Sequence, residues 1–200
     1  MSIQQHILNE FPFKPTSDQI EAIHQFSDFI NDNTSSKIFL LKGYAGTGKT
    51  TLIASWLKPL QRTGYKPVLM APTGRAAKVM STYAKTKAVT IHKRIYFAQQ
   101  GKQGGIQFKL QKNKFKKAVF IVDEASMIGD EKSSAKLFQN GSLLQDLIQY
   151  AHEGFQCKLV FVGDTAQLPP VKRELSPALN QDYLSSFFSV DVAEAQLSEV

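Results

Sequence analysis

The stretch Lys37-Ile-Phe-Leu-Leu-Lys-Gly43-Tyr-Ala-Gly-Thr-Gly-Lys-Thr50 carries the strongest signal in this chain of 200 residues. Its first part, residues 37–42, is an apolar run of strand length, which is typical of a strand buried on both faces of a parallel sheet. Residues 43–50 match G-x-x-x-x-G-K-[ST] at every position and precede a predicted helix over residues 49–62. Glycines in this context let backbone N–H groups surround phosphate oxygens at the N-terminus of a helix. The stretch therefore predicts a phosphate-binding loop.

The side chains of this loop have separate expected roles. Lys49 is expected to reach the β- and γ-phosphates of a nucleotide, and the hydroxyl of Thr50 is expected to bind Mg²⁺. The nucleotide-binding residues that the motif predicts are Gly43, Ala45, Gly46, Thr47, Gly48, Lys49, Thr50 and Thr51.

A second predicted strand, residues 118–122, leads directly into Asp123 and Glu124. A phosphate-binding loop needs a carboxylate at the end of a neighbouring strand, so Asp123 is the predicted Mg²⁺ ligand, directly or through a water. Glu124 is placed to orient or deprotonate an attacking water. The acidic start of a helix has the same letters, but the loop upstream favours a metal site.

A strand over residues 158–162 leads into Gly163-Asp-Thr-Ala-Gln167-Leu-Pro-Pro. Because this strand is expected to lie near the loop, Gln167 is a candidate sensor of the γ-phosphate. Asp164 is a candidate for orienting this segment or the attacking water. A capped turn before the proline pair is the structural alternative.

A strand over residues 67–71 leads into Pro72-Thr-Gly-Arg75. Ligands of parallel α/β sheets lie beyond the carboxyl ends of the strands, so Thr73 and Arg75 are candidates for binding a second anionic ligand. Thr90 and Lys93 add another hydroxyl and another base downstream. His92 lies between them, and a packed or capping histidine is the alternative to a direct role.

Strands and helices alternate along the chain, which predicts an α/β fold with a parallel sheet and right-handed crossovers. Residues 99–117 interrupt the alternation with three glycines and six lysines, and they form either a loop or a β-hairpin inserted into this frame. The predicted helices are residues 16–31, 49–62, 74–84 and 133–152, and the predicted strands are residues 37–42, 67–71, 118–122 and 158–162.

The charge of the chain is unevenly distributed. The formal net charge is +7, but residues 33–122 hold 15 Lys and 3 Arg and not one Asp or Glu, a charge of +18. This block disfavours binding of cations or basic peptides and favours polyanions such as nucleotide phosphates and nucleic acid. A solvated lysine-rich surface is the alternative explanation of the same charge.

Cysteine usage and hydropathy indicate the compartment. Cys157 is the single cysteine, so no disulfide can form within the chain, which fits a reducing setting. No apolar run approaches the ~20 residues of a membrane span. We therefore expect a cytoplasmic protein with no membrane partner.

The order of the motifs resembles that of superfamily 1B DNA helicases of the RecD/Dda type. The sequences GYAGTGKT, APTGRAAK, TIHK, VDEASM and GDTAQLPPV occur in this order, and the resemblance covers residues 15 to 172. It implies a RecA-like P-loop NTPase domain that binds ATP and Mg²⁺. It also implies translocation on single-stranded DNA in the 5′-to-3′ direction, unwinding of duplexes, and a role in DNA repair and recombination.

The resemblance also implies roles for individual residues. Gln19 in the sequence TSDQ matches the glutamine that reads the adenine edge, and Gln167 matches the glutamine that contacts the γ-phosphate and couples hydrolysis to movement. The residues that match the two DNA-contacting motifs are Pro72, Thr73, Gly74, Arg75, Thr90, His92 and Lys93.

We expect residues 1–200 to form the first motor domain (domain 1A), with the insertion 99–117. The segment 174–200 is expected to lead toward a second RecA-like domain. In the family ATP lies between two such domains, so this chain alone is expected to bind ATP weakly and to hydrolyse it very slowly. RNA as the track, a nucleotide-regulated binding switch and a small-molecule kinase are the alternatives, although no arginine cluster typical of a kinase lid follows the last predicted strand.

Overall fold

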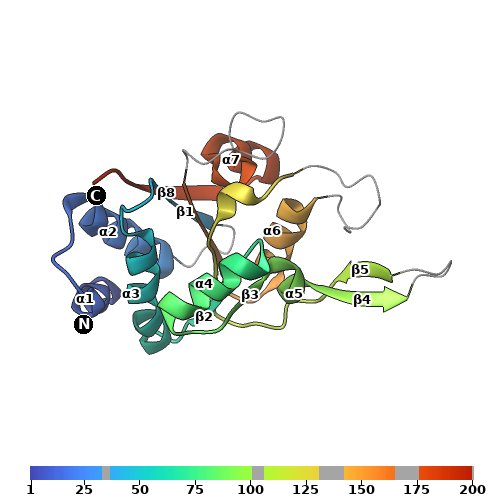
Figure 1. Ribbon diagram of the computed structural model, residues 1–200, viewed down its shortest axis with the longest axis horizontal. Coiled ribbons are helices and arrows are strands. Elements are labelled where there is room, and N and C mark those ends of the chain that lie inside the picture. Colours follow the sequence, from blue (N-terminus) through green and yellow to red (C-terminus); the bar gives the residue numbers. More distant parts are fainter. Residues whose placement is uncertain (33–36, 101–105, 131–141, 165–175, 200) are drawn as a thin grey trace.

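The computed structural model describes residues 1–32, 37–100, 106–130, 142–164 and 176–199. Within these residues, six strands form one sheet in the order β3-β2-β6-β7-β1-β8 (Figure 1). Every neighbouring pair in this sheet is parallel, so all carboxyl ends lie at one edge. The strands are β1 (Lys37–Gly43), β2 (Lys66–Ala71), β3 (Ala88–Thr90), β6 (Ala118–Val122), β7 (Lys158–Gly163) and β8 (Asp191–Leu197).

Helices cover both faces of the sheet. Side chains alternate between the faces along each strand, and apolar side chains pack on both of them. In β1, Phe39 and Leu41 pack into one hydrophobic cluster with helices α1 to α4, whereas Ile38 and Leu40 pack into a second cluster with α5 to α7. Parallel sheets are buried on both faces in this way. The helices are α1 (Ile3–Glu10), α2 (Ser17–Asn31), α3 (Lys49–Arg62), α4 (Gly74–Ala84), α5 (Ile91–Ile95), α6 (Leu143–Glu153) and α7 (Gln181–Phe188).

The structure confirms most of the elements predicted from the sequence. All four predicted strands and the helices over 16–31, 49–62 and 74–84 are present, with bounds that differ by at most one residue. The helix predicted over 133–152 is shorter in the described part of the chain: α6 begins after Ser142, whose hydroxyl accepts a hydrogen bond from the Gln145 amide at 3.1 Å. Part of that prediction, residues 133–141, lies outside the described residues. Short elements α1, β3, α5, α7 and β8 were not predicted.

The interruption predicted at 99–117 contains a β-hairpin. Strands β4 (Tyr96–Gln100) and β5 (Ile106–Leu110) pair antiparallel, and the hairpin projects from the body of the molecule (Figure 1). Its base is anchored where the Tyr96 hydroxyl donates to Oδ2 of the fully buried Asp146 at 2.6 Å. The hairpin therefore begins before residue 99 and ends well before residue 117.

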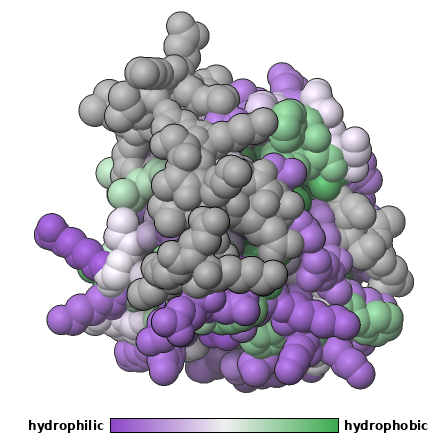
Figure 2. Space-filling view, turned by 90° about the vertical axis from the view of Figure 1, so that its right-hand side faces the viewer, coloured by the Kyte–Doolittle hydropathy of each residue, from purple (hydrophilic) through white to green (hydrophobic). Residues whose placement is uncertain are grey.

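Figure 2 views the molecule from the side on which the hairpin projects, and hydrophilic side chains cover much of the lower half of this face. The exposed lysines Lys109, Lys112 and Lys114 belong to β5 and the segment that follows it. Among the helices that the structure describes, none combines the length and the apolar composition needed to cross a membrane.

Candidate nucleotide-binding site

The loop between β1 and α3 has a backbone that only glycine adopts easily. Gly46 and Gly48 have φ of 87° and 90°, in the left-handed region where a Cβ is unfavourable. Gly48 is the N-cap of α3 and has no side chain to cap the first N–H groups, which leaves these donors for an anion. A Cβ on Gly43 would lie 2.7 Å from the Thr47 hydroxyl oxygen, so the turn closes tightly. The cradle therefore fits a phosphate group.

Lys49 lies across the mouth of this loop. Its ammonium donates to the carbonyl oxygens of Gly43 at 2.6 Å and Tyr44 at 2.8 Å. Burial lowers the pKa of Lys49, and nearby carboxylates oppose this change because they attract the charged form. The ammonium is thus held where a nucleotide phosphate could replace the carbonyl oxygens as its partner. The carboxylates are those of Asp164, Asp123 and Glu124.

These groups line one cavity of about 390 Å³. The cavity joins the loop and the start of α3 to Asp123 and Glu124 after β6 and to Gly163 and Asp164 at the end of β7. The residues of the loop and of α3 that line it are Ala45, Gly46, Gly48, Lys49, Thr50 and Thr51. The donors, a lysine, a hydroxyl and carboxylates together suit a nucleotide and Mg²⁺. Within the described residues no group of three His, Cys, Asp or Glu side chains is placed to hold a metal by itself.

Asp123 and Glu124 form a strained turn at the end of β6. Glu124 has φ 55° and ψ 37°, a left-handed conformation that is costly for a residue with a side chain. The Asp123 carboxylate supports this turn, because Oδ1 accepts a hydrogen bond from the Glu124 amide at 3.0 Å. The turn fixes the direction in which both carboxylates leave the strand.

Sequence reasoning missed Tyr83, in the last turn of α4. Its hydroxyl donates to Oδ2 of Asp123 at 2.5 Å and also interacts with the Thr50 side chain. Burial, assisted by the negative charge of Asp123, raises the pKa of Tyr83 well above its usual value, so the hydroxyl stays a donor at neutral pH. The spacing of Met80 and Tyr83 with Ala76 on the predicted helix was a signal that Tyr83 faces inward.

Gln19 lies beside the loop. Its Oε1 accepts a hydrogen bond from the Thr16 amide at 3.1 Å, which completes a capping box at the start of α2. Its Nε2 donates to the carbonyl oxygen of Thr47 at 3.0 Å. The structure therefore places Gln19 in direct contact with the phosphate-binding loop.

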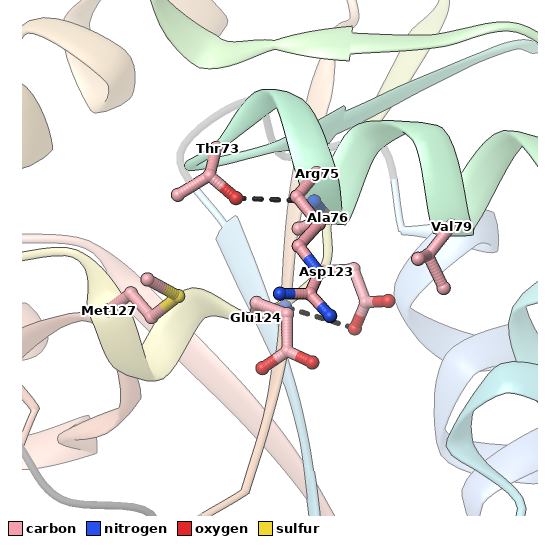
Figure 3. A pocket seen from close by; sticks show the side chains of 7 residues that line it. All are labelled: Thr73, Arg75, Ala76, Val79, Asp123, Glu124 and Met127. Carbon is pink, nitrogen blue, oxygen red and sulfur yellow. Dashed lines mark hydrogen bonds between the residues drawn. The ribbon is translucent and has the colours of Figure 1, made fainter.

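A second cavity of about 410 Å³ opens next to the first. Asp123 and Glu124 line both cavities, so the two share a wall. In Figure 3 the Arg75 side chain extends from α4 toward these two carboxylates. Thr73 caps α4, because its hydroxyl oxygen accepts a hydrogen bond from the Ala76 amide at 3.2 Å. Pro72, Thr73 and Gly74 thus form the entry to α4 at the same sheet edge as the phosphate-binding loop.

Thr90 lies directly beside this region. It pairs in register with Ala71 at the end of β2, so the predicted anion-binding residues of two strands are neighbours. The hydroxyl oxygen of Thr90 accepts a hydrogen bond from the Lys93 amide at 3.2 Å and caps α5. His92 and Lys93 are exposed on that helix. Gln167 lies outside the described residues.

Comparison with known proteins identifies a family and several helicases to which this chain is similar. Residues 27–173 match a family model described as an AAA domain. The chain belongs to the AAA domain family. The chain is similar to the ATP-dependent DNA helicase dda of Enterobacteria phage T4, with 31% identity over 80% of this chain and 34% of that protein. It is also similar to the ATP-dependent RecD2 DNA helicase of Deinococcus radiodurans, with 30% identity over 68% of this chain and 16% of that protein. These similarities confirm the resemblance to superfamily 1B helicases of the RecD/Dda type.

The crystal structure of Pif1 helicase from Candida albicans is also similar to this AAA domain. It has a TM-score of 0.54 and 24% identity, over 94% of this chain and 40% of that one. The likeness confirms the predicted RecA-like P-loop α/β fold. The AAA domain spans between 13% and 34% of the length of the curated relatives that it matches.

Proposed function

We propose that this chain is the ATP-binding first motor domain of an ATP-dependent DNA helicase that moves on single-stranded DNA from 5′ to 3′. The observation that supports this most directly is the wall shared by two cavities. Asp123 and Glu124 line the cavity of the phosphate-binding loop and also the cavity beside Thr73 and Arg75. An event at one cavity can therefore act on the groups that serve the other.

On the nucleotide side, residues of this chain bind and orient ATP. Lys49 and the N–H groups before α3 hold the phosphates, while Gln19 contacts the adenine edge. Thr50 and Asp123 hold Mg²⁺, which neutralises developing charge when bound. Glu124 orients or deprotonates the attacking water, and Gln167 contacts the γ-phosphate. The fixed turn at Glu124 supports this role, because catalysis depends on groups held in place before reaction.

On the DNA side, the residues at the ends of β2 and β3 bind the phosphodiester backbone. Arg75 and Lys93 are exposed cations, and Thr73 and Thr90 place hydroxyls at the same sheet edge. Residues 33–122 hold no carboxylate, so nothing in this block repels the phosphates. Backbone contacts read little sequence, and RNA is the alternative track. Segment 174–200 leads to a second RecA-like domain, which completes the ATP site and the motor.

Turnover of ATP by the full-length protein, with and without single-stranded DNA, tests this function. Stimulation is expected for a motor, whereas equal turnover would favour a nucleotide-regulated binding switch. Unwinding of 5′-tailed but not 3′-tailed duplexes is expected from the proposed direction. The 200-residue chain alone should bind ATP weakly, and strong DNA-stimulated turnover by it would contradict the need for a second domain.

A matched pair of variants tests the DNA-binding residues. Arg75→Ala in the full-length protein is expected to weaken binding of single-stranded DNA and to reduce its salt slope by about 0.7. Lys78→Ala is the control, because Lys78 is an exposed cation one turn further along α4 and does not line the second cavity. Equal effects of the two changes would indicate general charge attraction and contradict a specific role for Arg75.

A further inference from the structure

Tyr83 links helix α4 to the carboxylate of Asp123. The Tyr83 hydroxyl donates to Oδ2 at 2.5 Å, and the Glu124 amide donates to Oδ1 at 3.0 Å. Both carboxylate oxygens therefore have a donor. Glu124 is the next residue along the chain, whereas Tyr83 donates from another element, helix α4. The orientation of this carboxylate depends on where α4 lies.

The other end of α4 belongs to the second cavity. Thr73 caps the helix, and Arg75 and Ala76 in its first turn line the cavity together with Asp123 (Figure 3). Helix α4 is thus linked to the same carboxylate at both ends. Its first turn lines the second cavity together with Asp123, and Tyr83 in its last turn donates to Asp123. A regular helix carries a displacement along its length, because its backbone hydrogen bonds make it a rigid element.

We infer that Tyr83 is a positioning residue that couples binding of a phosphodiester at Thr73 and Arg75 to the orientation of Asp123 toward Mg²⁺. The inference rests on the proposed function, since it takes nucleic acid as the ligand of the second cavity and Asp123 as a metal ligand. Coupling of this kind is reciprocal: bound Mg²⁺-nucleotide must change the affinity for nucleic acid by the same factor.

A purely structural role for Tyr83 needs a control, because its ring also packs against the core beneath α1 to α4. Tyr83→Phe keeps the ring and removes only the hydroxyl. Tyr65→Phe is the matched control: Tyr65 packs against the same core, and its hydroxyl donates to the Ile30 carbonyl oxygen at 3.3 Å. Tyr65 lines neither cavity. Thermal melts establish that both variants are folded.

The first measurement is equilibrium binding of a fluorescent, non-hydrolysable ATP analogue to the 200-residue chain as a function of Mg²⁺ concentration. Loss of one hydrogen bond that orients Asp123 is expected to raise the Mg²⁺ midpoint of Tyr83→Phe roughly two- to tenfold. Tyr65→Phe should keep the wild-type midpoint. An unchanged midpoint for Tyr83→Phe, or a lower one as expected if the hydroxyl competes with the metal, overturns the positioning role.

The second measurement is the affinity of the full-length protein for a fluorescent oligo-thymidine, with and without the Mg²⁺-bound analogue. The wild-type ratio of affinities is expected to lie within the usual range of about 5- to 150-fold. Tyr83→Phe should bring this ratio closer to one, and Tyr65→Phe should leave it unchanged. A wild-type ratio in Tyr83→Phe overturns the inference. A wild-type protein that binds no oligonucleotide overturns the proposed function, and the Mg²⁺ titration then still decides whether Tyr83 positions Asp123.

Discussion

Gln19 supports the backbone of Thr47: its Nε2 donates to the Thr47 carbonyl oxygen at 3.0 Å. The family resemblance assigns Gln19 to the adenine edge. In the structure this side chain also supports the backbone of the phosphate-binding loop. A Cβ on Gly48 would lie 2.5 Å from the same nitrogen, so the loop and the glutamine fit closely.

Gln19→Ala is expected to weaken binding of both ATP and GTP by roughly two- to tenfold, because one hydrogen bond to the loop is removed. Any role at the adenine edge adds a further decrease in affinity for ATP only. Titration with fluorescent analogues of both nucleotides separates the two effects. Gln25→Ala is the control, since the half-buried Gln25 lies on the same helix and its Nε2 donates to Glu21 at 2.9 Å. Unchanged GTP affinity in Gln19→Ala would contradict a role of the Gln19–Thr47 hydrogen bond in supporting the loop.

Gly48→Ala and Gly64→Ala separate backbone strain from contact with Gln19. Both glycines have positive φ, 90° and 83°, so each alanine is expected to cost about 1–2 kcal/mol of unfolding free energy. In the part of the chain that the structure describes, no atom lies within 4 Å of a Cβ on Gly64. Chemical denaturation should therefore show similar decreases in stability, while nucleotide titration should show weakened binding only for Gly48→Ala. Equal nucleotide affinity of the two variants would show that the contact is unimportant.

The lysines after the hairpin are expected to take no part in DNA binding. Lys112, Lys114, Lys116 and Lys117 are exposed on the segment that runs from β5 to the amino end of β6. There the Lys66 amide, at the start of β2, donates to the Lys117 carbonyl oxygen at 2.7 Å. This is the sheet edge opposite to the one where Thr73 and Thr90 lie.

Replacing these four lysines with glutamine in the full-length protein should therefore leave DNA affinity and its salt slope unchanged. Binding of single-stranded DNA at several salt concentrations measures the slope, which falls by about 0.7 for each phosphate that the protein no longer neutralises. A reduced slope would show that DNA reaches the edge of the sheet where β6 begins and that these four lysines contact it.

Glu124→Gln is expected to lower ATP turnover of the full-length protein by ~10²–10⁴-fold, because the amide cannot accept a proton. Nucleotide affinity should change little, since the strained backbone at this residue is kept. Steady-state turnover and equilibrium titration measure the two effects. Glu153→Gln at the exposed end of α6 is the control. Normal turnover in Glu124→Gln would assign the catalytic carboxylate to another residue.

Local patterns predicted much of this protein. The strand, loop and helix around Gly43–Thr50 occupy consecutive residues, so their letters and spacing were enough to place the phosphate-binding loop. Apolar runs such as 118–122 predicted buried strands for the same reason. The short elements β3 and α5 escaped prediction because three to five residues carry too little periodicity.

Residue types and their spacing were sufficient to predict the chemistry: a phosphate-binding loop, a carboxylate pair after a strand, and a long stretch free of acids. Which of these groups lie in contact became known from the folded chain. Tyr83 donates a hydrogen bond to Asp123, and the lysines after the hairpin lie at the sheet edge opposite to Thr73. Such contacts depend on the strand order β3-β2-β6-β7-β1-β8, which arises from packing of the whole sheet. Local spacing cannot encode that order, because neighbours in the sheet are far apart along the chain.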